Sequence, residues 1–395
     1  MQINITHLTS VHPRYDTRIF LKECSSLAKI EGYRVNLVVA DGKGDEEKNG
    51  VKIHDVGCLP GRLNRIFRTT KNVYKKALEL DSDIYHLHDP ELIPVGLKLK
   101  KRGKRVIFDV HENIAKQMID KDYMPKAMRN IISKLYRYYE KKTLNKFDYI
   151  VLAENSYDKD YGKLSVNIEI ILNMPQIEPL GKFVNFKREK AELFYIGGIS
   201  KNRGIDVIIE AVKILKEKFP AILLHCIGPY DKILLENLEI KDVQDNINFY
   251  GRLQLYEGLN YSINAKAGLS ILKPIKNYTE SYSTKVFEYM AIGLPVITSD
   301  FEIYRKIIQK NNCGICVNPE NPTEIAEAIE YIISHPKEAE EMGKNGRKAV
   351  EEKYNWSIEE KKLLKVYEDI ISGSKRGSGC GSECGRESEG VKDKD

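Results

Sequence analysis

Two glutamates, Glu280 and Glu288, stand eight residues apart in the segment ESYSTKVFEYMAIGLPVI, which covers residues 280–297. The pattern of residues 284–291 predicts a helix, which the following glycine and proline bring to an end. Glu280 is then expected in the loop before the helix, and Glu288 about one turn into it. A carboxylate at the second position can accept hydrogen bonds from neutral hydroxyls, as a carboxylate does from the ribose of a nucleotide.

The start of this predicted helix has the chemistry of an anion site. Ser283, Thr284 and Lys285 fall at its N-terminus, where backbone amides are unpaired and the helix dipole is positive. A helix that begins at the carboxyl end of a strand is a ready site for phosphate. A phosphate site flanked by groups that bind hydroxyls fits a nucleotide-sugar. The alternative is a surface helix with an ordinary glutamate.

A second group of candidates follows the first predicted strand, in the segment HPRYDTRIFLKE at residues 12–23. Asp16 or Thr17 can cap the helix expected there. Arg18 then lies in the first turn, where the helix dipole disfavours a cation unless an anion is near. We therefore consider Asp16 and Arg18 as contacts to a phosphate or to an acceptor molecule.

Histidines mark the ends of two further predicted strands. His86 and His88 lie two residues apart, so strand alternation places both on one face, and His111 ends the next strand. With the acidic residues nearby, the first pair can be interpreted as a metal site or as hydrogen-bonded histidines at a strand end. We favour the hydrogen-bonded interpretation and predict no metal site.

These candidates lie on a regular alternation of short apolar runs and longer segments of helical period. Most runs are rich in Val and Ile and apolar on both faces, which is typical of buried parallel strands. The alternation predicts doubly wound α/β sheets, with ligands bound at the carboxyl ends of the strands. The runs are 3–8, 33–41, 52–56, 84–89, 105–111, 149–154, 168–174, 193–197, 222–228, 247–251, 267–272, 295–300 and 314–318.

The runs form two series, which predicts two doubly wound domains of similar size facing each other across a cleft. We assign residues 1–175 to the first domain and 191–356 to the second, with a polar linker at 176–190. A final helix is expected over 357–371. The Gly- and Ser-rich stretch 372–395 cannot bury a core and is expected to be disordered.

The composition excludes several classes of protein. The chain has 395 residues, 42% hydrophobic and 30% charged, which is ordinary for a globular protein. A net charge of +6 is too small to predict a nucleic-acid partner. No apolar run reaches the 18 residues of a transmembrane helix, and the start lacks a signal-peptide pattern. Seven cysteines in so long a chain do not predict a disulfide framework, so a cytoplasmic protein is expected.

The string around the two glutamates resembles a known signature. Glu280, seven intervening residues and Glu288 within FEYMAIGLPV are similar to the E-x7-E motif of retaining glycosyltransferases with the GT-B fold, above all family 4. The resemblance covers nearly all of residues 1–371. It implies two Rossmann-like domains, sugar transfer from a nucleotide-sugar, and front-face attack in which the departing phosphate takes the acceptor's proton. It also implies that neither a metal nor another cofactor is needed.

The resemblance extends to the segment LFYIGGISKNRGID at residues 193–206. In the family, an arginine and a lysine of this strand and loop hold the diphosphate of the donor. Here Gly198 stands in place of the arginine and Arg203 in place of the lysine. Lys201 and Lys285 are the two candidates to replace the missing positive charge.

The same resemblance implies roles for individual residues. The loops after the next two strands approach the donor, one glutamate binds hydroxyls of the transferred sugar, and a first-domain histidine lies beside that sugar. The expected donor-binding residues are Gly197, Arg203, Gly228, Arg252, Ser283, Thr284, Lys285 and Glu288; the catalytic ones are Glu280 and His111; Asp16, Arg18 and His88 face the acceptor or a phosphate.

Two stretches, 62–76 and 126–146, concentrate basic charge. In the second, the apolar residues Met128, Ile131, Ile132, Leu135 and Tyr139 recur with helical spacing and form an apolar stripe. Such segments suit an anionic membrane surface, where a lipid-linked acceptor would be found. Alternatively, the stripe packs on the sheet and the lysines face water. Both interpretations remain open.

Relatives that share this first-domain segment often build bacterial surface polysaccharide, such as capsule or lipopolysaccharide O-antigen. The resemblance therefore implies a cytoplasmic glycosyltransferase, at most peripheral at the inner face of the plasma membrane. Its partners would be a nucleotide-sugar donor and a glycan or lipid-linked acceptor. The rival hypotheses are a sugar-nucleotide-binding module with weak or no activity, and another GT-B enzyme such as a nucleotide-sugar epimerase.

Overall fold

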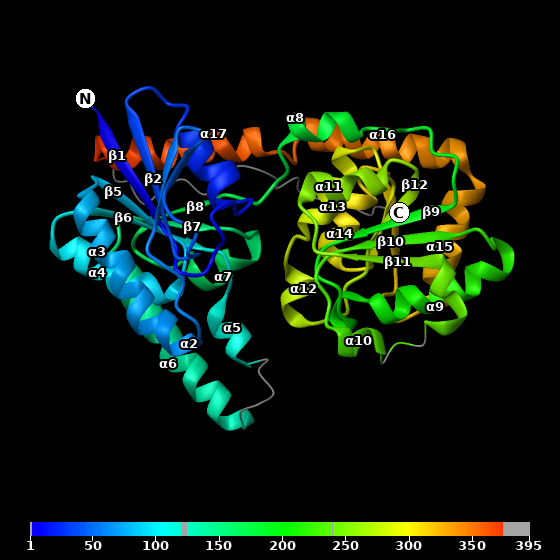
Figure 1. Cartoon of the computed structure of the whole chain (residues 1–395), viewed down its shortest axis with the longest axis horizontal. Helices are drawn as coiled ribbons and strands as arrows, with labels where there is room; N and C mark the ends of the chain where they lie inside the picture. The colour runs from blue at the N-terminus through cyan, green and yellow to red at the C-terminus, as the bar shows by residue number, and fades with distance from the viewer. Residues whose placement is uncertain (1, 120–124, 237, 239, 374–395) are drawn as a thin grey trace, which may run out of the picture.

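The computed structural model describes residues 2–119, 125–236, 238 and 240–373, and within them it places two open sheets next to each other (Figure 1). The strand orders, β3-β4-β2-β1-β5-β6-β7-β8 and β11-β10-β9-β12-β13-β14, are those of doubly wound domains. The predicted pair of Rossmann-like domains is therefore confirmed. Of the stretch predicted to be disordered, 372–395, all residues from 374 onward lie outside the described residues.

In the first sheet, β1 lies in the middle and pairs with β2 on one side and β5 on the other, so that Ile5 is opposite both Val35 and Ile84. The predicted apolar runs form the parallel strands, because residues apolar on both faces are stable only where helices cover each side. The strands are β1 (Ile3–Leu8), β2 (Tyr33–Val39), β3 (Glu46–Lys48), β4 (Val51–Asp55), β5 (Ile84–Leu87), β6 (Arg105–Val110), β7 (Tyr149–Leu152) and β8 (Asn167–Ile170).

One strand, β3, is missing from the predicted set. It runs antiparallel to β4 at the sheet edge, with Lys48 opposite Val51. The two residues between them, Asn49 and Gly50, have φ of 52° and 74°, as a two-residue hairpin turn with positive φ at both positions requires. The Asn-Gly pair was the signal for this hairpin, whereas the strand itself is too short and polar to show a period.

The second sheet repeats the same order around β9, which pairs with β10 and β12. All of its described pairings are parallel, so the carboxyl ends of its strands meet at one edge. The strands are β9 (Glu192–Ile196), β10 (Leu223–Ile227), β11 (Ile247–Gly251), β12 (Ala265–Ser270), β13 (Val296–Ser299) and β14 (Gly314–Val317).

Helices and short helical turns connect the strands, and none of the described helices is long and apolar enough to cross a membrane. In the first half of the chain they are η1 (Ile19–Cys24), α1 (Ser25–Leu27), α2 (Arg62–Asn64), η2 (Arg65–Thr69), α3 (Thr70–Leu80), η3 (Pro90–Leu92), α4 (Ile93–Lys101), α5 (Ile114–Ile119), α6 (Lys126–Leu144), η4 (Asn155–Tyr157) and α7 (Asp158–Tyr161). In the second half they are α8 (Ile177–Leu180), η5 (Gly181–Phe183), η6 (Lys201–Arg203), α9 (Ile205–Lys218), α10 (Lys232–Glu236), η7 (Lys241–Asn246), α11 (Leu255–Leu259), η8 (Asn260–Ser262), α12 (Lys276–Glu280), α13 (Thr284–Ala291), α14 (Glu302–Ile308), α15 (Pro322–Ser334), α16 (Pro336–Glu352) and α17 (Trp356–Ser372).

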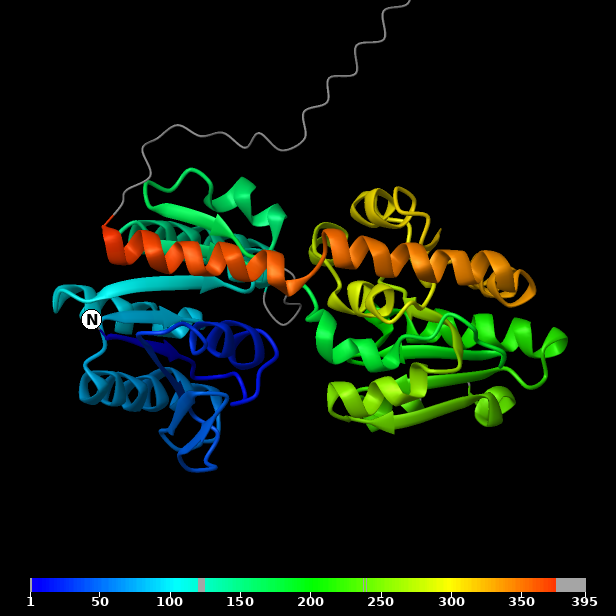
Figure 2. The same ribbon diagram turned by 90° about the horizontal axis from the view of Figure 1, so that it is seen from above.

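The C-terminal helix lies against the first domain, although it follows the second in sequence. After α16 the chain crosses back and runs along the first sheet as α17, the orange-to-red helix of Figure 2. Leu363, Val366 and Tyr367 are fully buried there in the core of the first domain. The Trp356 indole donates to Ser26 Oγ at 2.9 Å and secures the start of the helix. The predicted C-terminal helix therefore forms, and it completes a domain far away in sequence.

The segment predicted as a polar linker, 176–190, packs on the second domain. It contains α8 and η5, and Leu180 and Phe183 are buried in the second core. The Arg188 guanidinium is buried as well and donates to backbone carbonyls of the second domain, among them that of Ala265 at 3.1 Å. These carbonyl contacts explain how so polar a segment can be buried.

Candidate active site

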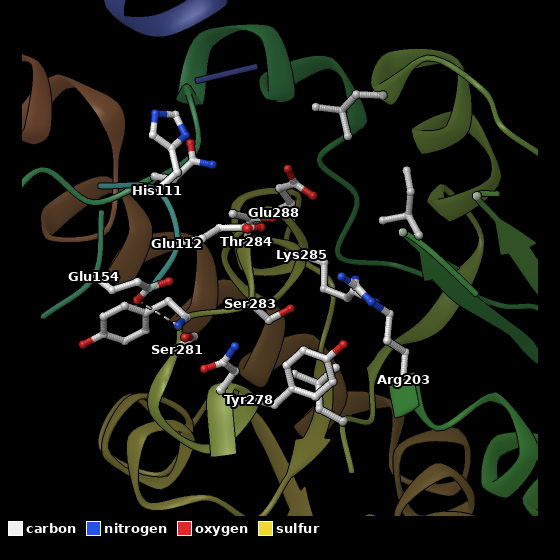
Figure 3. A pocket seen from close by; sticks show the side chains of 18 of the residues that line it. His111, Glu112, Glu154, Arg203, Tyr278, Ser281, Ser283, Thr284, Lys285 and Glu288 are labelled. Carbon is white, nitrogen blue, oxygen red and sulfur yellow. Dashed lines mark hydrogen bonds between the residues drawn. The ribbon is translucent and has the colours of Figure 1, made fainter. Parts of the chain in front are cut away.

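The carboxyl edges of the two sheets enclose a cavity of about 660 Å³. One wall comes from the loops after the first-domain strands β6, β7 and β8, and the other from the loops after β9, β10 and β11 and from the start of α13. Figure 3 shows side chains of both domains around this one space. His111 and all the residues expected to bind the donor line it: Gly197, Arg203, Gly228, Arg252, Ser283, Thr284, Lys285 and Glu288.

Two glycines allow the loops after β9 and β10 to touch. Gly197 and Gly228 have φ of 128° and 146°, where a side chain would be strained. A Cβ on Gly228 would stand 1.9 Å from the carbonyl oxygen of Gly197, and one on Gly197 would stand 3.3 Å from Lys285 Nζ. This part of the cavity wall is therefore bare backbone beside the Lys285 ammonium.

Helix α13 directs its N-terminus into the cavity and has the predicted bounds, Thr284–Ala291. Ser283 is extended at the N-cap position, and its amide donates to the Tyr304 hydroxyl at 3.0 Å. The amides of Thr284 and Lys285 follow in the first turn, where amides have no partner within the helix. With the helix dipole they make this end favourable for an anion.

The Lys285 ammonium is buried and has no hydrogen-bond partner among the described residues. Its Nζ lies 3.8 Å from the centre of the Tyr195 ring. Burial is the main cause that lowers the pKa of Lys285 to about 7, and the positive charge of Arg203 adds to it. The negative charge of Glu288 acts in the opposite direction. A buried cation in this position gains from a bound anion. Of the two lysines considered as replacements for the missing arginine, Lys285 lines the cavity, whereas Lys201 is exposed and does not line it.

Glu288 lies one turn further along α13 and is partly buried. Burial raises the pKa of Glu288, while the charges of Lys22 and Lys285 lower it. Lys22 belongs to η1 of the first domain; burial lowers its pKa to about 8, and its Nζ donates to Asn173 Oδ1 at 2.6 Å. Lys22 and Asn173 are absent from the predicted site, although a polar Asn173 near the end of the predicted run 168–174 was a usable signal.

Glu280 is the last residue of α12, so the prediction that it lies in an open loop was wrong. The reason is that residues 276–280 close a helical turn before the chain becomes extended at Ser281. Glu280 is not among the residues that line the cavity. Its carboxylate accepts from Lys116 Nζ of the first domain at 3.1 Å, and Lys116 also pairs with Asp160. In this structure Glu280 therefore ties the two domains together.

Glu154 forms a second contact across the cleft and is absent from the predicted site. It follows β7, and its Oε2 accepts a hydrogen bond from the amide of Tyr282 at 3.1 Å. Burial raises the pKa of Glu154 to about 8, although this hydrogen bond opposes the shift. Glu154 is therefore mostly a neutral acid at pH 7. An acidic residue at the end of a predicted apolar run, here 149–154, was the signal that could have identified it.

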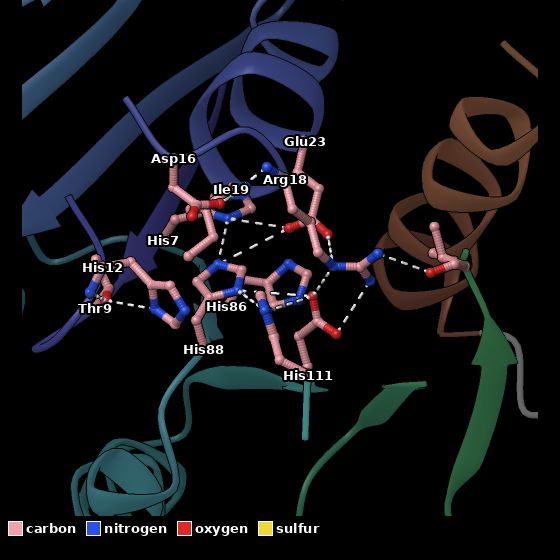
Figure 4. A network of polar contacts seen from close by, with 12 residues as sticks. His7, Thr9, His12, Asp16, Arg18, Ile19, Glu23, His86, His88 and His111 are labelled. Atoms are coloured by element: carbon pink, nitrogen blue, oxygen red, sulfur yellow. Dashed lines mark hydrogen bonds and ion pairs between the residues drawn. The ribbon is translucent and has the colours of Figure 1, made fainter. Parts of the chain in front are cut away.

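Asp16 and Arg18 are engaged inside the first domain (Figure 4). Asp16 Oδ1 accepts from the amides of Arg18 and Ile19, each at 2.9 Å, and so caps η1 as expected. The Arg18 guanidinium pairs with Asp109, with Nε to Oδ2 at 2.9 Å and Nη2 to Oδ1 at 3.1 Å, and lies 3.0 Å from Glu23. Arg18 needs a nearby anion because it stands at the start of a helix, and this anion is the carboxylate of Asp109 within the same domain. Arg18 borders a side cavity of about 120 Å³ and not the main one.

His88 lies behind His111 and does not reach the main cavity. Its Nδ1 is 3.1 Å from His111 Nε2, and its Nε2 is 2.9 Å from His7 Nδ1. His7, Glu23, His86 and His88 each offer a metal-ligand type of atom, and these atoms lie within 4.8 Å of one another. Ring nitrogens of His7, His86 and His88 take part in hydrogen bonds within the protein, whereas His86 Nε2 has no partner among the described residues. The absence of a metal here stays a prediction.

His111 stands where the main cavity meets a second one of about 790 Å³, which lies next to α6 and η2. His111 Nε2 is 3.0 Å from Asp109 Oδ2. Glu112 and Gln117 also line both cavities, and apolar side chains such as Ile66 line the second one. A molecule in one cavity would therefore meet a molecule in the other at His111.

Two protein-family models match the chain. The model described as "Glycosyltransferase Family 4" matches residues 18–173, and the one described as "Glycosyl transferases group 1" matches residues 177–349. Together they cover both domains. The chain belongs to glycosyltransferase family 4. The expected glycosyltransferase activity and the GT-B fold are thereby confirmed.

Curated relatives of this glycosyltransferase include enzymes with quite different names. A phosphatidyl-myo-inositol mannosyltransferase of Mycobacterium leprae is 22% identical over 75% of this chain and 76% of its own. A capsular polysaccharide biosynthesis glycosyltransferase, CapM of Staphylococcus aureus, is 26% identical over 46% of each chain.

Solved structures with low sequence identity share the fold. Sucrose-phosphate synthase of Thermosynechococcus elongatus superposes with a TM-score of 0.74 at 16% identity, over 94% of this chain and 100% of the other. HepE of Anabaena, in complex with UDP-glucose, superposes with a TM-score of 0.69 at 12% identity, over 93% of this chain and 100% of its own. At these identities the likeness concerns the arrangement of the two domains.

The pKa of Lys285 predicts how binding of a nucleotide-sugar changes with pH. Only the ammonium form attracts the diphosphate, and with a pKa of about 7 this form is half populated near pH 7, nearly complete about one pH unit below and largely lost about one unit above. Affinity should therefore fall as the pH rises, by up to roughly tenfold per pH unit above about 7. Isothermal titration calorimetry measures this affinity. A nucleotide-sugar is the ligand to use, because its phosphates do not titrate in this pH range.

The matched variant is Lys285→Arg, which keeps its charge at every pH and should show a clearly shallower profile between pH 6 and pH 9. Proton uptake, measured in buffers of different ionisation enthalpy, should accompany binding to the natural protein and be smaller in the variant, in which Glu154 is a cavity group that still titrates in this range. Equal pH dependence in both proteins would contradict the role given to Lys285.

Proposed function

We propose that this glycosyltransferase moves a sugar, with retention of configuration, from a nucleotide-sugar to a glycan or lipid-linked acceptor in bacterial surface polysaccharide biosynthesis. The observation that carries the donor class is the unpartnered Lys285 ammonium beside Arg203 at the start of α13. Two cations and a helix N-terminus suit two linked phosphates. Further support comes from HepE, solved with UDP-glucose, and from CapM, named for capsular polysaccharide biosynthesis.

In this proposal the second domain stabilises the leaving group. Negative charge grows on the diphosphate as its bond to the sugar breaks, and Lys285, Arg203 and the α13 amides stand ready to stabilise it. Glu288 binds hydroxyls of the ribose. Glu280 binds hydroxyls of the transferred sugar, which requires donor binding to displace Lys116 from it.

The nucleobase of the donor can be identified with a thermal-shift screen of UDP, GDP, ADP, CMP and their sugar conjugates. A ligand at about 100 times its Kd adds roughly 2.7 kcal/mol of stability. With the donor known, Glu288→Gln should raise the donor KM and lower kcat, reducing kcat/KM about tenfold or more, because the charged partner of the ribose hydroxyls is lost.

Glu327→Gln is the matched control, because Glu327 is exposed on α15 and is not among the residues that line the cavity. A normal kcat/KM in Glu288→Gln would contradict the assignment. Binding without turnover would favour the sugar-nucleotide-binding module, and a changed nucleotide-sugar released without acceptor would favour an epimerase.

Transfer is expected to proceed without a metal ion, because Arg203 and Lys285 supply the positive charge that a metal would bring to the diphosphate. The initial rate of sugar transfer should be the same with and without EDTA. A rate that EDTA abolishes and Mg²⁺ restores would overturn this part of the proposal.

The apolar stripe of α6 provides an observation about the acceptor side. Met128, Ile131 and Leu135 are 46%, 59% and 64% exposed, whereas the polar side chains of Ser133 and Glu140 on the same helix are buried. The helix thus presents its apolar stripe to solvent. The interpretation that the stripe packs on the sheet was wrong, because Ser133 and Glu140 have hydrogen-bond partners on the buried side.

The neighbouring segment α2–η2 adds to this surface, and Figure 1 shows α2 and α6 at the same end of the first domain. Its Leu63 and Phe67 are 72% and 69% exposed, and Arg62 and Arg68 beside them are exposed as well. We name the exposed residues of α2, η2 and α6 the α2–α6 surface. Apolar side chains among basic ones suit an anionic bilayer, and the second cavity lies beneath them. The proposal therefore places a cytoplasmic enzyme, peripherally bound, at the inner face of the plasma membrane.

Sedimentation with lipid vesicles tests this docking. The full-length protein should bind vesicles that contain phosphatidylglycerol, bind neutral vesicles less, and release as salt rises, because surface charges are screened. The double variant Leu63→Ser, Phe67→Ser should bind at least about tenfold more weakly. Ile233→Ser, which changes a similarly exposed apolar residue of the second domain, is the control and should bind as the natural protein does.

Equal binding to neutral and anionic vesicles, or none at low salt, would contradict membrane docking. If the natural protein instead forms dimers in solution and the double variant is monomeric, a second copy of the chain covers the α2–α6 surface.

A further inference from the structure

The amino edge of the second sheet has a cavity of its own. This cavity has a volume of about 390 Å³ and is bordered by Lys266 near the start of β12, by Pro295 directly before β13, by the segment 186–189 and by the start of α16. None of the described residues that border it also lines the main cavity, which lies at the carboxyl ends of the strands. A cavity of this size can hold a small molecule.

Lys266 is placed at this cavity by an irregularity in the sheet. The pairing of β12 with β9 passes over it, because Ala265 is opposite Glu192 and Ala267 is opposite Leu193. Lys266 is therefore an extra residue of its strand, as in a β-bulge, and such residues often direct a side chain toward a functional site. Lys266 is only 8% exposed, and its ammonium has no hydrogen bond and no ion pair among the described residues.

Arg188 brings a second buried positive charge to the same cavity. Its Nη atoms donate to backbone carbonyls, among them those of Ile263 at 3.2 Å and Ile292 at 3.1 Å, while its Nε has no hydrogen-bond partner among the described residues. Burial lowers the pKa of Arg188 to about 10 and also lowers the pKa of Lys266, to which the charge of Arg188 contributes. Two buried cations without a bonded carboxylate are unfavourable, and an anion in the cavity would compensate them.

Two acidic residues, Glu189 and Glu340, also border the cavity, but they do not neutralise these cations. The Glu340 carboxylate lies 2.7 Å from Lys344 Nζ and is engaged there. Glu189 is exposed, and its charge raises the pKa of Lys266 without forming an ion pair with it. The exposed Lys187 adds a further positive charge. The lining therefore keeps an excess of positive charge.

The rest of the lining is apolar and comes from Phe186, Pro295, Pro336 and Ala339. An apolar wall beside two cations suits a molecule that has an anionic group at one end and an apolar body. We propose that this cavity is a second ligand site, in which Lys266, supported by the charge of Arg188, binds the phosphate or carboxylate of a small organic anion. The site is separate from the donor site and does not depend on the proposed sugar transfer.

Isothermal titration calorimetry with phenyl phosphate and with benzoate tests the site, because these probes carry the two kinds of anionic group on the same apolar ring. At least one of them should bind the full-length protein with a Kd of about 1 mM or lower, whereas benzyl alcohol, a neutral analogue, should bind much more weakly. Lys266→Met keeps a long apolar side chain but removes its charge, and should weaken binding at this site at least about tenfold.

Lys285→Met separates this site from the main cavity, because it removes the buried cation there. Full-length Lys285→Met should still bind the probe at a single site, and adding Lys266→Met should abolish that binding. Lys348→Met makes the same chemical change at an exposed lysine of α16 that does not border the cavity, so it is the matched control and should bind as the natural protein does.

Thermal unfolding provides a second readout without any ligand. A buried ammonium without a partner lowers the stability of the fold, so Lys266→Met should have a higher Tm than the natural protein, and Lys348→Met should have about the same Tm. A lower Tm of Lys266→Met would show that Lys266 serves the fold and would contradict the proposal.

The proposal would also be overturned if neither probe bound the natural protein, or if Lys266→Met bound the probe as the natural protein does. A probe that lost its affinity in Lys285→Met but kept it in Lys266→Met would be bound in the main cavity, which would exclude the second site. Neither measurement needs a donor, an acceptor or turnover, so failure of the proposed function would leave this test intact.

Discussion

The buried carboxylate of Asp109 organises the first domain's side of the site. Out of water, an ionised carboxylate is stable only when cations and N–H groups surround it. Arg18, the residue directly before η1, supplies two hydrogen bonds to it and a third to the carbonyl of Ile171 after β8. His111, from the loop after β6, approaches it from the cavity. The pair of Asp109 and Arg18 thus joins segments that are distant in sequence. Removal of either partner would lower the free energy of unfolding by about 3–5 kcal/mol, because the other charge would stay buried without its partner.

The two walls of the cleft differ in how their charges are satisfied. In the first domain, the cation Arg18 is bonded to carboxylates of its own domain and has no need of a ligand. In the second domain, Lys285 and Arg203 lie side by side, and burial together with their mutual repulsion lowers the pKa of Lys285. The second wall therefore gains most from an anion, whereas the first presents His111, which contacts the carboxylate of Asp109. The charges of the two walls are thus satisfied in different ways.

Contacts between the domains involve the same short stretch that leads into α13. Glu280 is held by Lys116, and the amide of Tyr282 is held by Glu154. The chain also crosses between the domains twice, before α8 and again before α17. A donor that enters the cavity therefore meets a stretch already engaged with the first domain, so binding and the relative position of the domains are physically linked.

The sequence by itself determined the parallel strands along the chain, the two domains and the residues with which the second domain lines the cavity. Apolar runs form buried parallel strands wherever they occur, and a helix that starts after a strand brings its first residues, here Ser283 to Lys285, to the cleft edge. The partners of charged side chains were decided only by the tertiary structure. Arg18 is paired with Asp109 and Glu280 with Lys116, while the apolar stripe of α6 faces water. Pairing and burial depend on which distant segments meet in space, and no local pattern records that.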